Sequence, residues 1–210
     1  MKAPKTQPSR SAGNRDRIFK AACSLFRRQG FHGTSTREIA ERAGVSLGNI
    51  YNHFKTKEDL FVFILSQFEE EYFRPDQPLY KIFADTSFPE NIEALGQASG
   101  RMVEKFSDYM LLMYVDVVEF DAKHIGRLFS GMRDRYAKML ASRPGGPPRL
   151  RAGIDPAGAM MMVVWSFFNY FMMEKLFKVE NHYGMDDAEV IRMFATVFRK
   201  GLLPEDRQTR

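Results

Sequence analysis

The sequence predicts an all-helical protein with a small amino-terminal domain and a larger carboxy-terminal one. Apolar residues recur every three or four positions along most of the chain, and no stretch alternates in the way of a half-buried strand. Capping residues and glycines divide this pattern into separate helical segments. The 210 residues, 44% of them hydrophobic, are enough to bury the core of one large or two small domains.

The first segment predicts a flexible tail followed by a helix. Residues 1–13 are rich in Pro, Ser, Lys and Gly and offer little to bury, so we expect them to be flexible. Asn14 can cap a helix that ends at Gly30. Cys23, the single cysteine, falls on this helix and is interpreted as a small core residue. The apolar stripe of the helix consists of Ile18, Ala21, Ala22, Leu25 and Phe26.

Two short helices joined by a glycine follow. Ser35 and Glu38 have the spacing of a capping box. The helix that they open stops at Gly44, which can adopt the positive φ of a sharp turn. Ser46 can cap a second helix over residues 47–54 directly afterwards. This spacing predicts a helix-turn-helix, the motif that places its second helix in the major groove of DNA.

The second helix of this pair has an outward face without a core role. Ile50 and Phe54 lie four positions apart and face inward, whereas Gly48 lowers helix propensity and adds nothing to a core. A glycine at such a place allows a large partner, such as a duplex, to approach the backbone closely.

These residues also carry a resemblance to a known family. The matching positions are Gly30, Phe31, Thr34, Ile39, Ala40, Ala43, Gly44, Val45, Ser46, Gly48, Ile50, Tyr51, His53, Phe54, Lys57, Glu58 and Leu60. Together they resemble the amino-terminal domain of the tetracycline-repressor (TetR) family over about residues 14–65. The resemblance implies a DNA-binding domain over residues 14–57 and a ligand-binding and dimerisation domain over residues 58–210. It also implies a homodimer formed through the last two helices.

The resemblance further implies which residues contact DNA. Base-edge or phosphate contacts are expected from the second helix, at Leu47, Gly48, Asn49, Tyr51 and Asn52. Phosphate contacts are expected from Thr36, Arg37, His53 and Lys57. Leu47 and Asn52 sit where members of the family differ, which makes them candidates for the choice of DNA sequence.

Charge is distributed unevenly along the chain. Residues 1–57 hold 12 of the 31 Lys and Arg but only three of the 26 Asp and Glu, although the net charge of the whole chain is only +5. A basic amino-terminal end favours nucleic acid as the partner. The alternative is a basic tail on a neutral domain. Residues 1–13 are accordingly either an arm that reaches the DNA or a plain leader.

The remainder predicts further helices. Thr56 and Asp59 open a long helix to about Glu71, which we expect to transmit a ligand signal between the domains. Residues 74–89, which contain three prolines, are expected to break the pattern. Further helices are expected over residues 89–107, 108–120, 123–142, 155–178 and 186–201, with a loop at residues 143–153.

One of these helices is apolar on every side. Residues 160–173 (MMMVVWSFFNYFMM) cannot form the surface helix of a monomer, because no face is polar. We expect one face to pack on its own domain and another on the same helix of a second subunit. The last helix would lie beside it with Val190, Phe194, Val197 and Phe198.

The carboxy-terminal part also predicts a cavity for a hydrophobic small molecule, because methionines and aromatic residues adapt to irregular ligands. The same stripes suit a plain core. The predicted wall residues are Met102, Phe106, Met110, Met113, Tyr114, Trp165, Phe168, Asn169 and Met172. Asn169, a lone amide on an apolar helix, would either orient a ligand or fix the register of the dimer.

A helical metal protein is a second class. Asp116, Glu119 and His124 place two carboxylates and an imidazole within nine residues. The alternative is a charged stripe in which Glu119 pairs with Lys123. No phosphate loop, His-Glu-x-x-His or activated-serine pattern occurs, so we predict no cofactor, no metal and no enzymatic activity.

The chain is therefore predicted to be a ligand-responsive transcriptional regulator, a repressor released from a palindromic operator by a hydrophobic effector. A DNA-bound activator or architectural protein without a ligand is the alternative. The single cysteine, the lack of a signal segment and apolar runs shorter than the ~20 residues of a membrane span predict a cytoplasmic protein without a membrane partner.

Overall fold

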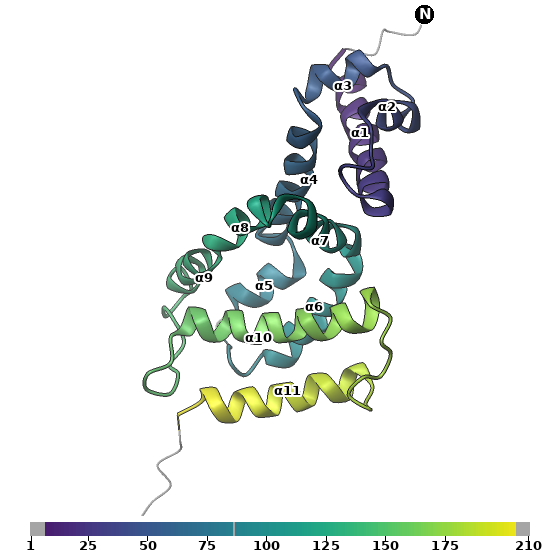
Figure 1. The fold of residues 1–210 in the computed structure, drawn as a ribbon. Helices are drawn as coiled ribbons and strands as arrows, with labels where there is room; N and C mark the ends of the chain where they lie inside the picture. Colours follow the sequence, from purple (N-terminus) through teal and green to yellow (C-terminus); the bar gives the residue numbers. More distant parts are fainter. Residues whose placement is uncertain (1–6, 86, 205–210) are drawn as a thin grey trace, which may run out of the picture. The chain divides into compact units, whose positions relative to one another are not determined.

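The computed structural model describes residues 7–85 and 87–204, and the regular structure in these ranges is helical, without a strand. This result confirms the all-helical fold class. In chain order (Figure 1), the helices are α1 (Gln7–Gln29), α2 (Thr36–Ala43), α3 (Leu47–His53), α4 (Lys57–Tyr72), α5 (Pro78–Ala84), α6 (Ile92–Lys105), α7 (Ser107–Phe120), α8 (Lys123–Ser130), α9 (Met132–Ala141), α10 (Pro156–Phe171) and α11 (Asp187–Leu202). A π-helical segment, η1 (Met172–Leu176), continues α10.

The chain divides into two compact units. The first combines the chain up to Glu70 with Asp108–Leu128, and the second combines Glu71–Ser107 with the chain from Phe129 onward. The division therefore runs through α4 and near the start of α7. It differs from the predicted domains of residues 14–57 and 58–210, which stay a proposal about function.

The core of the first unit joins the amino-terminal helices to α7. Phe61 of α4 lies with its ring 5.4 Å from that of Phe26 in α1 and 5.3 Å from that of Phe120 in α7. Leu112 of α7 and Ile50 of α3 are buried in the same cluster. Because α7 contributes to this core, it helps to position the helix pair α2–α3.

The second unit is built around α10. This helix packs against α6 and α9, while α11 packs against α6 and α10, and α5 packs against α6 and α9. Figure 1 shows α10 and α11 lying side by side. Val163, Val164 and Phe167 of α10 are fully buried, whereas Met162 and Trp165 are exposed. The helix thus buries one face in its own unit and leaves apolar side chains on another.

The predicted helix starts are confirmed wherever the sequence offers a capping side chain after residue 30. Thr56 and Asp59 exchange two hydrogen bonds at the start of α4, from the Thr56 amide to Asp59 Oδ2 at 2.9 Å and from the Asp59 amide to Thr56 Oγ1 at 3.0 Å. Side-chain oxygens likewise accept hydrogen bonds from backbone amides at Ser35, Ser46, Asp155 and Asp186.

The start of α1 was predicted wrongly. Residues 7–13 are helical instead of flexible, and residues 1–6 of the predicted tail lie outside the described residues. Pro8 falls in the first turn of the helix. Backbone amides of the first turn have no acceptor within the helix, so a proline is tolerated there. Asn14 is consequently inside the helix and caps nothing. Its Oδ1 accepts a hydrogen bond from Arg17 Nη2 at 2.7 Å.

The predicted break at residues 74–89 contains the short helix α5. Pro78 occupies the start of this helix, where its fixed φ favours helix formation. Leu79 and Phe83 then lie one turn apart and are fully buried. The prolines of this stretch therefore begin a helix as well as end one.

Two long predicted helices are interrupted. The helix expected over residues 123–142 is divided into α8 and α9, because Gly131 lies outside helical geometry between them. The helix expected to reach Lys178 is α-helical only to Phe171. The amide of Phe177 then bonds to the carbonyl of Met172 at 3.0 Å, and Lys178 adopts a positive φ of 57°.

Candidate DNA-binding site and carboxy-terminal grooves

Local hydrogen bonds fix the start of α2, and a left-handed glycine forms the turn that leads to α3. Ser35 Oγ accepts from the Glu38 amide at 3.1 Å, while Glu38 Oε2 accepts from the Ser35 amide at 2.7 Å. These hydrogen bonds from Ser35 hold the pKa of Glu38 below its ordinary value. Gly44 adopts φ 62° and ψ 42°, a conformation that costs other residues a steric penalty. The predicted capping box and glycine stop are both confirmed.

The outward face of α3 is accessible at most of its positions. Leu47 is 37% exposed and Tyr51 is 50% exposed, and Asn52 is also exposed. A methyl group added at Gly48 would meet no heavy atom within 4 Å. Ile50 faces the core, as predicted. Four of the five residues predicted on α3, Leu47, Gly48, Tyr51 and Asn52, are therefore accessible.

The other predicted DNA contacts differ in their exposure. Arg37 is exposed, whereas Thr36 and His53 are half-buried. Asn49 is also half-buried, and its Oδ1 is buried without a hydrogen-bond partner in the described structure. Asn49 thus keeps an acceptor that the protein itself does not satisfy.

Lys57 has a role within the protein that sequence reasoning missed. Its ammonium group donates hydrogen bonds to the carbonyls of Phe31 at 2.7 Å and Thr34 at 2.6 Å, and it lies 4.2 Å from the centre of the Phe31 ring. Burial lowers the pKa of Lys57, although Glu119 and Glu38 act in the opposite direction. Lys57 therefore ties α4 to the loop between α1 and α2, and its phosphate contact stays a prediction.

Glu119 of α7 binds the same loop. Its carboxylate accepts hydrogen bonds from the amides of Phe31 at 2.9 Å and His32 at 2.6 Å and contacts His32 Nδ1 at 2.6 Å. Gly30 makes this approach possible, because a methyl group there would lie 2.2 Å from Glu119 Oε1. Phe31 and Glu119 are 88 positions apart, so no pattern in the sequence predicted this hydrogen bond.

The residues of the metal hypothesis make hydrogen bonds instead of gathering around one point. Asp116 Oδ2 accepts from the amides of His124 at 3.1 Å and Ile125 at 2.9 Å, and Asp116 Oδ1 bonds His124 Nδ1 at 2.6 Å. His124 Nε2 lies 3.1 Å from Glu58 Oε1. Glu119 is bound to the loop at His32. Across the described residues, no three His, Cys, Asp or Glu side chains are placed to hold one metal ion.

The predicted pair between Glu119 and Lys123 is wrong. Lys123 Nζ instead lies 2.6 Å from Glu58 Oε1. The physical reason is the turn between them, in which Asp121 and Ala122 adopt positive φ values of 53° and 57°. Residues 119 and 123 therefore do not share one helix.

The predicted effector residues are divided between the two units. Met110, Met113 and Tyr114 belong to the first unit, and the other six belong to the second. Met102, Phe106 and Met110 are buried, Met113 packs on the core of the first unit, and Tyr114 is exposed. Phe168 has its ring 6.0 Å from that of Tyr72, and Met172 is half-buried.

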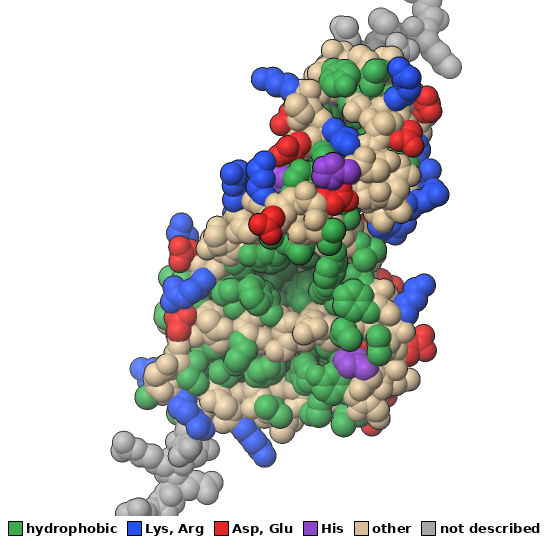
Figure 2. All heavy atoms as spheres, in the orientation of Figure 1, with side chains coloured by type: hydrophobic (Ala, Val, Ile, Leu, Met, Phe, Trp, Pro, Cys, Tyr) green, Lys and Arg blue, Asp and Glu red, His purple; other side chains and the backbone are tan. Residues whose placement is uncertain are grey.

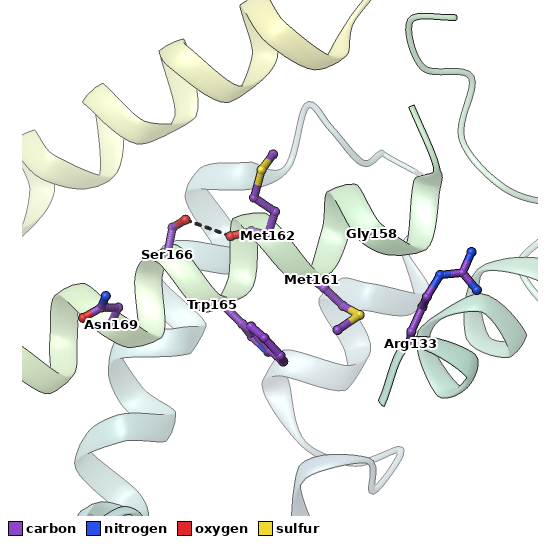
Figure 3. Close-up of a pocket in the computed structure, with 7 residues that line it drawn as sticks. All are labelled: Arg133, Gly158, Met161, Met162, Trp165, Ser166 and Asn169. Atoms are coloured by element: carbon purple, nitrogen blue, oxygen red, sulfur yellow. Dashed lines mark hydrogen bonds between the residues drawn. The ribbon is translucent and has the colours of Figure 1, made fainter. Parts of the chain in front are cut away.

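Two of the predicted effector residues, Trp165 and Asn169, line an open groove of about 540 Å³ along α10. Figure 3 shows Trp165 and Met161 on one side of the helix and Ser166 and Met162 on another, with Arg133 of α9 at one end. The remaining wall residue is Gly158. A second groove of about 470 Å³ shares Ser166 and Asn169 and adds Tyr170, Met173, His182, Tyr183 and Phe194.

The exposed surface around these grooves is apolar. Met162 is 49% exposed and Trp165 is 45% exposed on α10, and Val197 is 62% exposed on α11. Figure 2 shows hydrophobic side chains gathered over the face that α10 and α11 present in that view. No described helix is both long and apolar enough to cross a membrane.

Two capped helices hinged at a left-handed glycine, with an accessible face on the second, define a helix-turn-helix protein. Comparison with known proteins narrows the class of helix-turn-helix protein. The family model described as "Bacterial regulatory proteins, tetR family" matches residues 18–63, so this segment of the chain corresponds to the amino-terminal domain of that family. The matching relatives are named as transcriptional regulators, in agreement with the prediction that the chain is not an enzyme.

Two relatives illustrate the match. The HTH-type transcriptional repressor KstR2 of Mycolicibacterium smegmatis is 34% identical over 102 residues, which cover 49% of this chain and 48% of that protein. The HTH-type transcriptional regulator QacR of Staphylococcus aureus is 43% identical over 58 residues, which cover 28% of this chain and 31% of that protein. The chain thus aligns with about half, or less, of the length of these relatives.

Solved structures share the fold over most of the chain. A TetR-family member from Streptomyces coelicolor A3 has a TM-score of 0.64 at 21% identity, with 88% of this chain and 97% of that chain covered. The multidrug binding protein EbrR, solved with imidazole, has a TM-score of 0.58 at 22% identity, with 88% and 93% covered. At these identities the likeness concerns the fold alone.

Proposed function

We propose that the chain is a homodimeric transcriptional repressor that binds a palindromic DNA operator and is released by a hydrophobic small molecule. The observation that carries this proposal is the accessible face of α3, because Leu47, Tyr51 and Asn52 project from a helix whose other side is buried. The match of residues 18–63 to a family of bacterial regulatory proteins supports it.

The chemistry of α3 suits the edges of base pairs. An asparagine amide can donate to and accept from adenine in the major groove, and Leu47 can contact a thymine methyl group. Gly48 would allow the helix to enter deeply, because nothing projects from it. Phosphate contacts from Thr36, Arg37, His53 and Lys57 would fix the orientation.

The dimer would form through α10 and α11. Their exposed apolar side chains, Met162, Trp165 and Val197, are a surface that soluble monomers rarely leave uncovered. A twofold dimer formed there would carry two α3 helices and bind half-sites roughly 34–36 Å apart. Asn169, exposed among these residues, would fix the register of the contact or orient a ligand.

Release would require an effector that prefers a dimer with a different separation of its α3 helices. Trp165 and Asn169 supply an aromatic surface and an amide for such a molecule. The remaining predicted wall residues, Met102, Phe106, Met110, Met113, Tyr114, Phe168 and Met172, stay candidates. Two chain segments would transmit the signal to the helix pair: α4, held by Lys57, and α7, held by Glu119.

The direct test selects duplexes from a random pool and measures binding of the recovered operator by fluorescence anisotropy. Tyr51→Ala and Asn52→Ala should each weaken binding by about 1–3 kcal/mol. Tyr114→Ala is the matched control, since it removes an equally accessible tyrosine from α7 of the same unit and should leave binding unchanged. Equal binding of all four proteins to the operator would refute the proposal.

Lys57→Ala needs a stability measurement beside the binding measurement. The substitution removes two hydrogen bonds to the loop at residues 31–34, so it should lower thermal stability as well as affinity. A loss of operator affinity that is larger than the loss of thermal stability can explain would support a contact between Lys57 and a phosphate.

A further inference from the structure

Arg143 is a buried arginine with donor groups that the described protein leaves unpaired. It follows α9 directly and is 5% exposed. Its backbone is held in a turn, with the Arg143 carbonyl accepting from the Gly146 amide at 2.9 Å. Its side-chain Nε and Nη1 groups are buried without a hydrogen-bond partner. Buried guanidinium groups are normally paired or fully hydrogen-bonded.

Arg151, in the same loop, has a guanidinium group whose donors do find acceptors. Arg151 Nη2 donates to the carbonyl of Lys200 at 3.0 Å, and Arg151 Nε reaches that of Leu203 at 3.4 Å, so its charge stabilises the carboxyl end of α11. Arg143 Nε and Nη1 lack such acceptors in the described structure. Among the described residues, Arg143 is also the sole arginine in the buried class.

One acidic group lies within electrostatic reach of Arg143. The preceding helix, α9, is buried at Tyr136 and Leu140, and the Tyr136 ring lies 5.2 Å from that of Phe83 in α5. Burial lowers the pKa of Arg143, and the charge of Asp85 opposes this effect. Asp85 is exposed and accepts a hydrogen bond from the Ser87 amide at 2.9 Å, so its carboxylate is already engaged.

We propose that Arg143 is an anion-binding residue that receives the carboxylate or phosphate group of a small molecule. A guanidinium offers several fixed N–H donors and forms its strongest hydrogen bonds with these two groups. A water molecule could satisfy the donors but could not neutralise the charge. This site goes beyond the proposed function, because it binds an anion whether or not that anion releases DNA.

The test measures anion binding by titration calorimetry and thermal unfolding, without DNA and at constant ionic strength. The probes are inorganic phosphate, acetate, decanoate and the uncharged decanol. The wild-type protein should bind at least one of the anions and be stabilised by it. Arg143→Met should lower that affinity by about tenfold to a hundredfold, as expected for lost hydrogen bonds to a charged group. Arg149→Met, which removes an exposed arginine of the same loop, should leave it unchanged.

Two further expected effects, one on stability and one on anion affinity, have the opposite sign to the loss of affinity in Arg143→Met. Without an anion, Arg143→Met should be at least as stable as the wild type, because a buried charge with unpaired donors is replaced by an apolar chain of similar length. Asp85→Asn should strengthen anion binding, because it removes the negative charge that opposes it. This second variant keeps the test informative even if Arg143→Met fails to fold.

The probes distinguish the source of the anion. Binding of phosphate alone assigns the site to phosphate groups, and binding of decanoate without decanol assigns it to amphipathic carboxylic acids. Equal binding of decanoate and decanol, equal stabilisation of wild type and Arg143→Met, or no binding of any anion would overturn the inference. None of these readouts depends on the operator, so failure here and failure of the repressor proposal are distinguishable.

Discussion

The outward faces of α3 and α10 differ in a way that suggests two kinds of partner. α3 has seven residues and presents a glycine, an exposed amide and a tyrosine. α10 has 16 residues and presents a tryptophan and a methionine beside one amide. Hydrogen-bonding groups on a short helix suit the base edges of a duplex, whereas apolar side chains on a long helix suit a large dry contact. This difference supports the proposal that α3 recognises DNA and that α10 forms the dimer contact.

The largest expected effect comes from adding charge to the face of α10. Trp165→Glu would bury a carboxylate in the proposed dimer contact, so we expect a loss of at least about 2 kcal/mol of association free energy. Analytical ultracentrifugation should then show monomers at concentrations where the wild type is dimeric. Val118→Glu is the control, because Val118 is 82% exposed on α7, which is not part of the proposed dimer contact, and the substitution should not change the oligomeric state.

The next effect concerns the attachment of the helix pair to α7. Glu119→Gln removes the negative charge that accepts hydrogen bonds from Phe31 and His32. We expect a loss of about 1–3 kcal/mol in the free energy of unfolding, since two backbone amides lose a charged acceptor. Chemical denaturation measures this loss. Glu104→Gln, at an exposed position of α6, should change stability little, and equal stability of the two variants would contradict the role given to Glu119.

Two glycines of the helix pair offer a matched test of a smaller effect. Gly44→Ala places a side chain in the left-handed region, so we expect about 1 kcal/mol of lost stability. Gly48→Ala meets no neighbour within 4 Å and should keep or raise stability by up to about 1 kcal/mol. Operator affinity should nevertheless fall in Gly48→Ala, because the methyl group projects from the face that we assign to DNA. Full operator affinity in Gly48→Ala would contradict the proposed contact between α3 and the duplex.

The smallest effect is a pH dependence. Burial alone would raise the pKa of Glu119, but hydrogen bonds from His32 and Phe31 outweigh it and hold the pKa below the ordinary value of 4.5. The unfolded chain then binds the proton more readily, so stability is present above this value and is lost as the pH falls through the lower pKa of the folded state. Unfolding curves between pH 6 and pH 3 should show a shallower loss for Glu119→Gln than for the wild type. Parallel curves would contradict this assignment.

The sequence predicted features that depend on neighbours in the chain. Ser35, Gly44 and Thr56 act on residues three or four positions away, so their caps and turn were visible as spacing. Glu119 and Lys57 act on residues far away in the sequence, and no spacing announces such contacts. The accessible side chains of α3 could thus be predicted, while the attachments that hold α3 in place could not.

The larger unit was harder to predict for a related reason. Its methionines and aromatic residues fit a core, a cavity or a partner surface equally well in sequence, and only burial separates them. Met102 and Phe106 are buried, whereas Trp165 and Asn169 of the same predicted set lie on a groove. The unpaired state of Arg143 was likewise invisible, because a buried charge cannot be recognised without its surroundings.

The central claim is that α3 reads DNA while α10 and α11 hold two copies together. The most direct measurement is the mass and sequence preference of the complex formed with duplexes selected from a random pool, determined by sedimentation and sequencing. The account predicts a dimer on a palindrome whose half-sites lie roughly 34–36 Å apart. A single subunit bound to one half-site, or equal retention of every duplex, would contradict it.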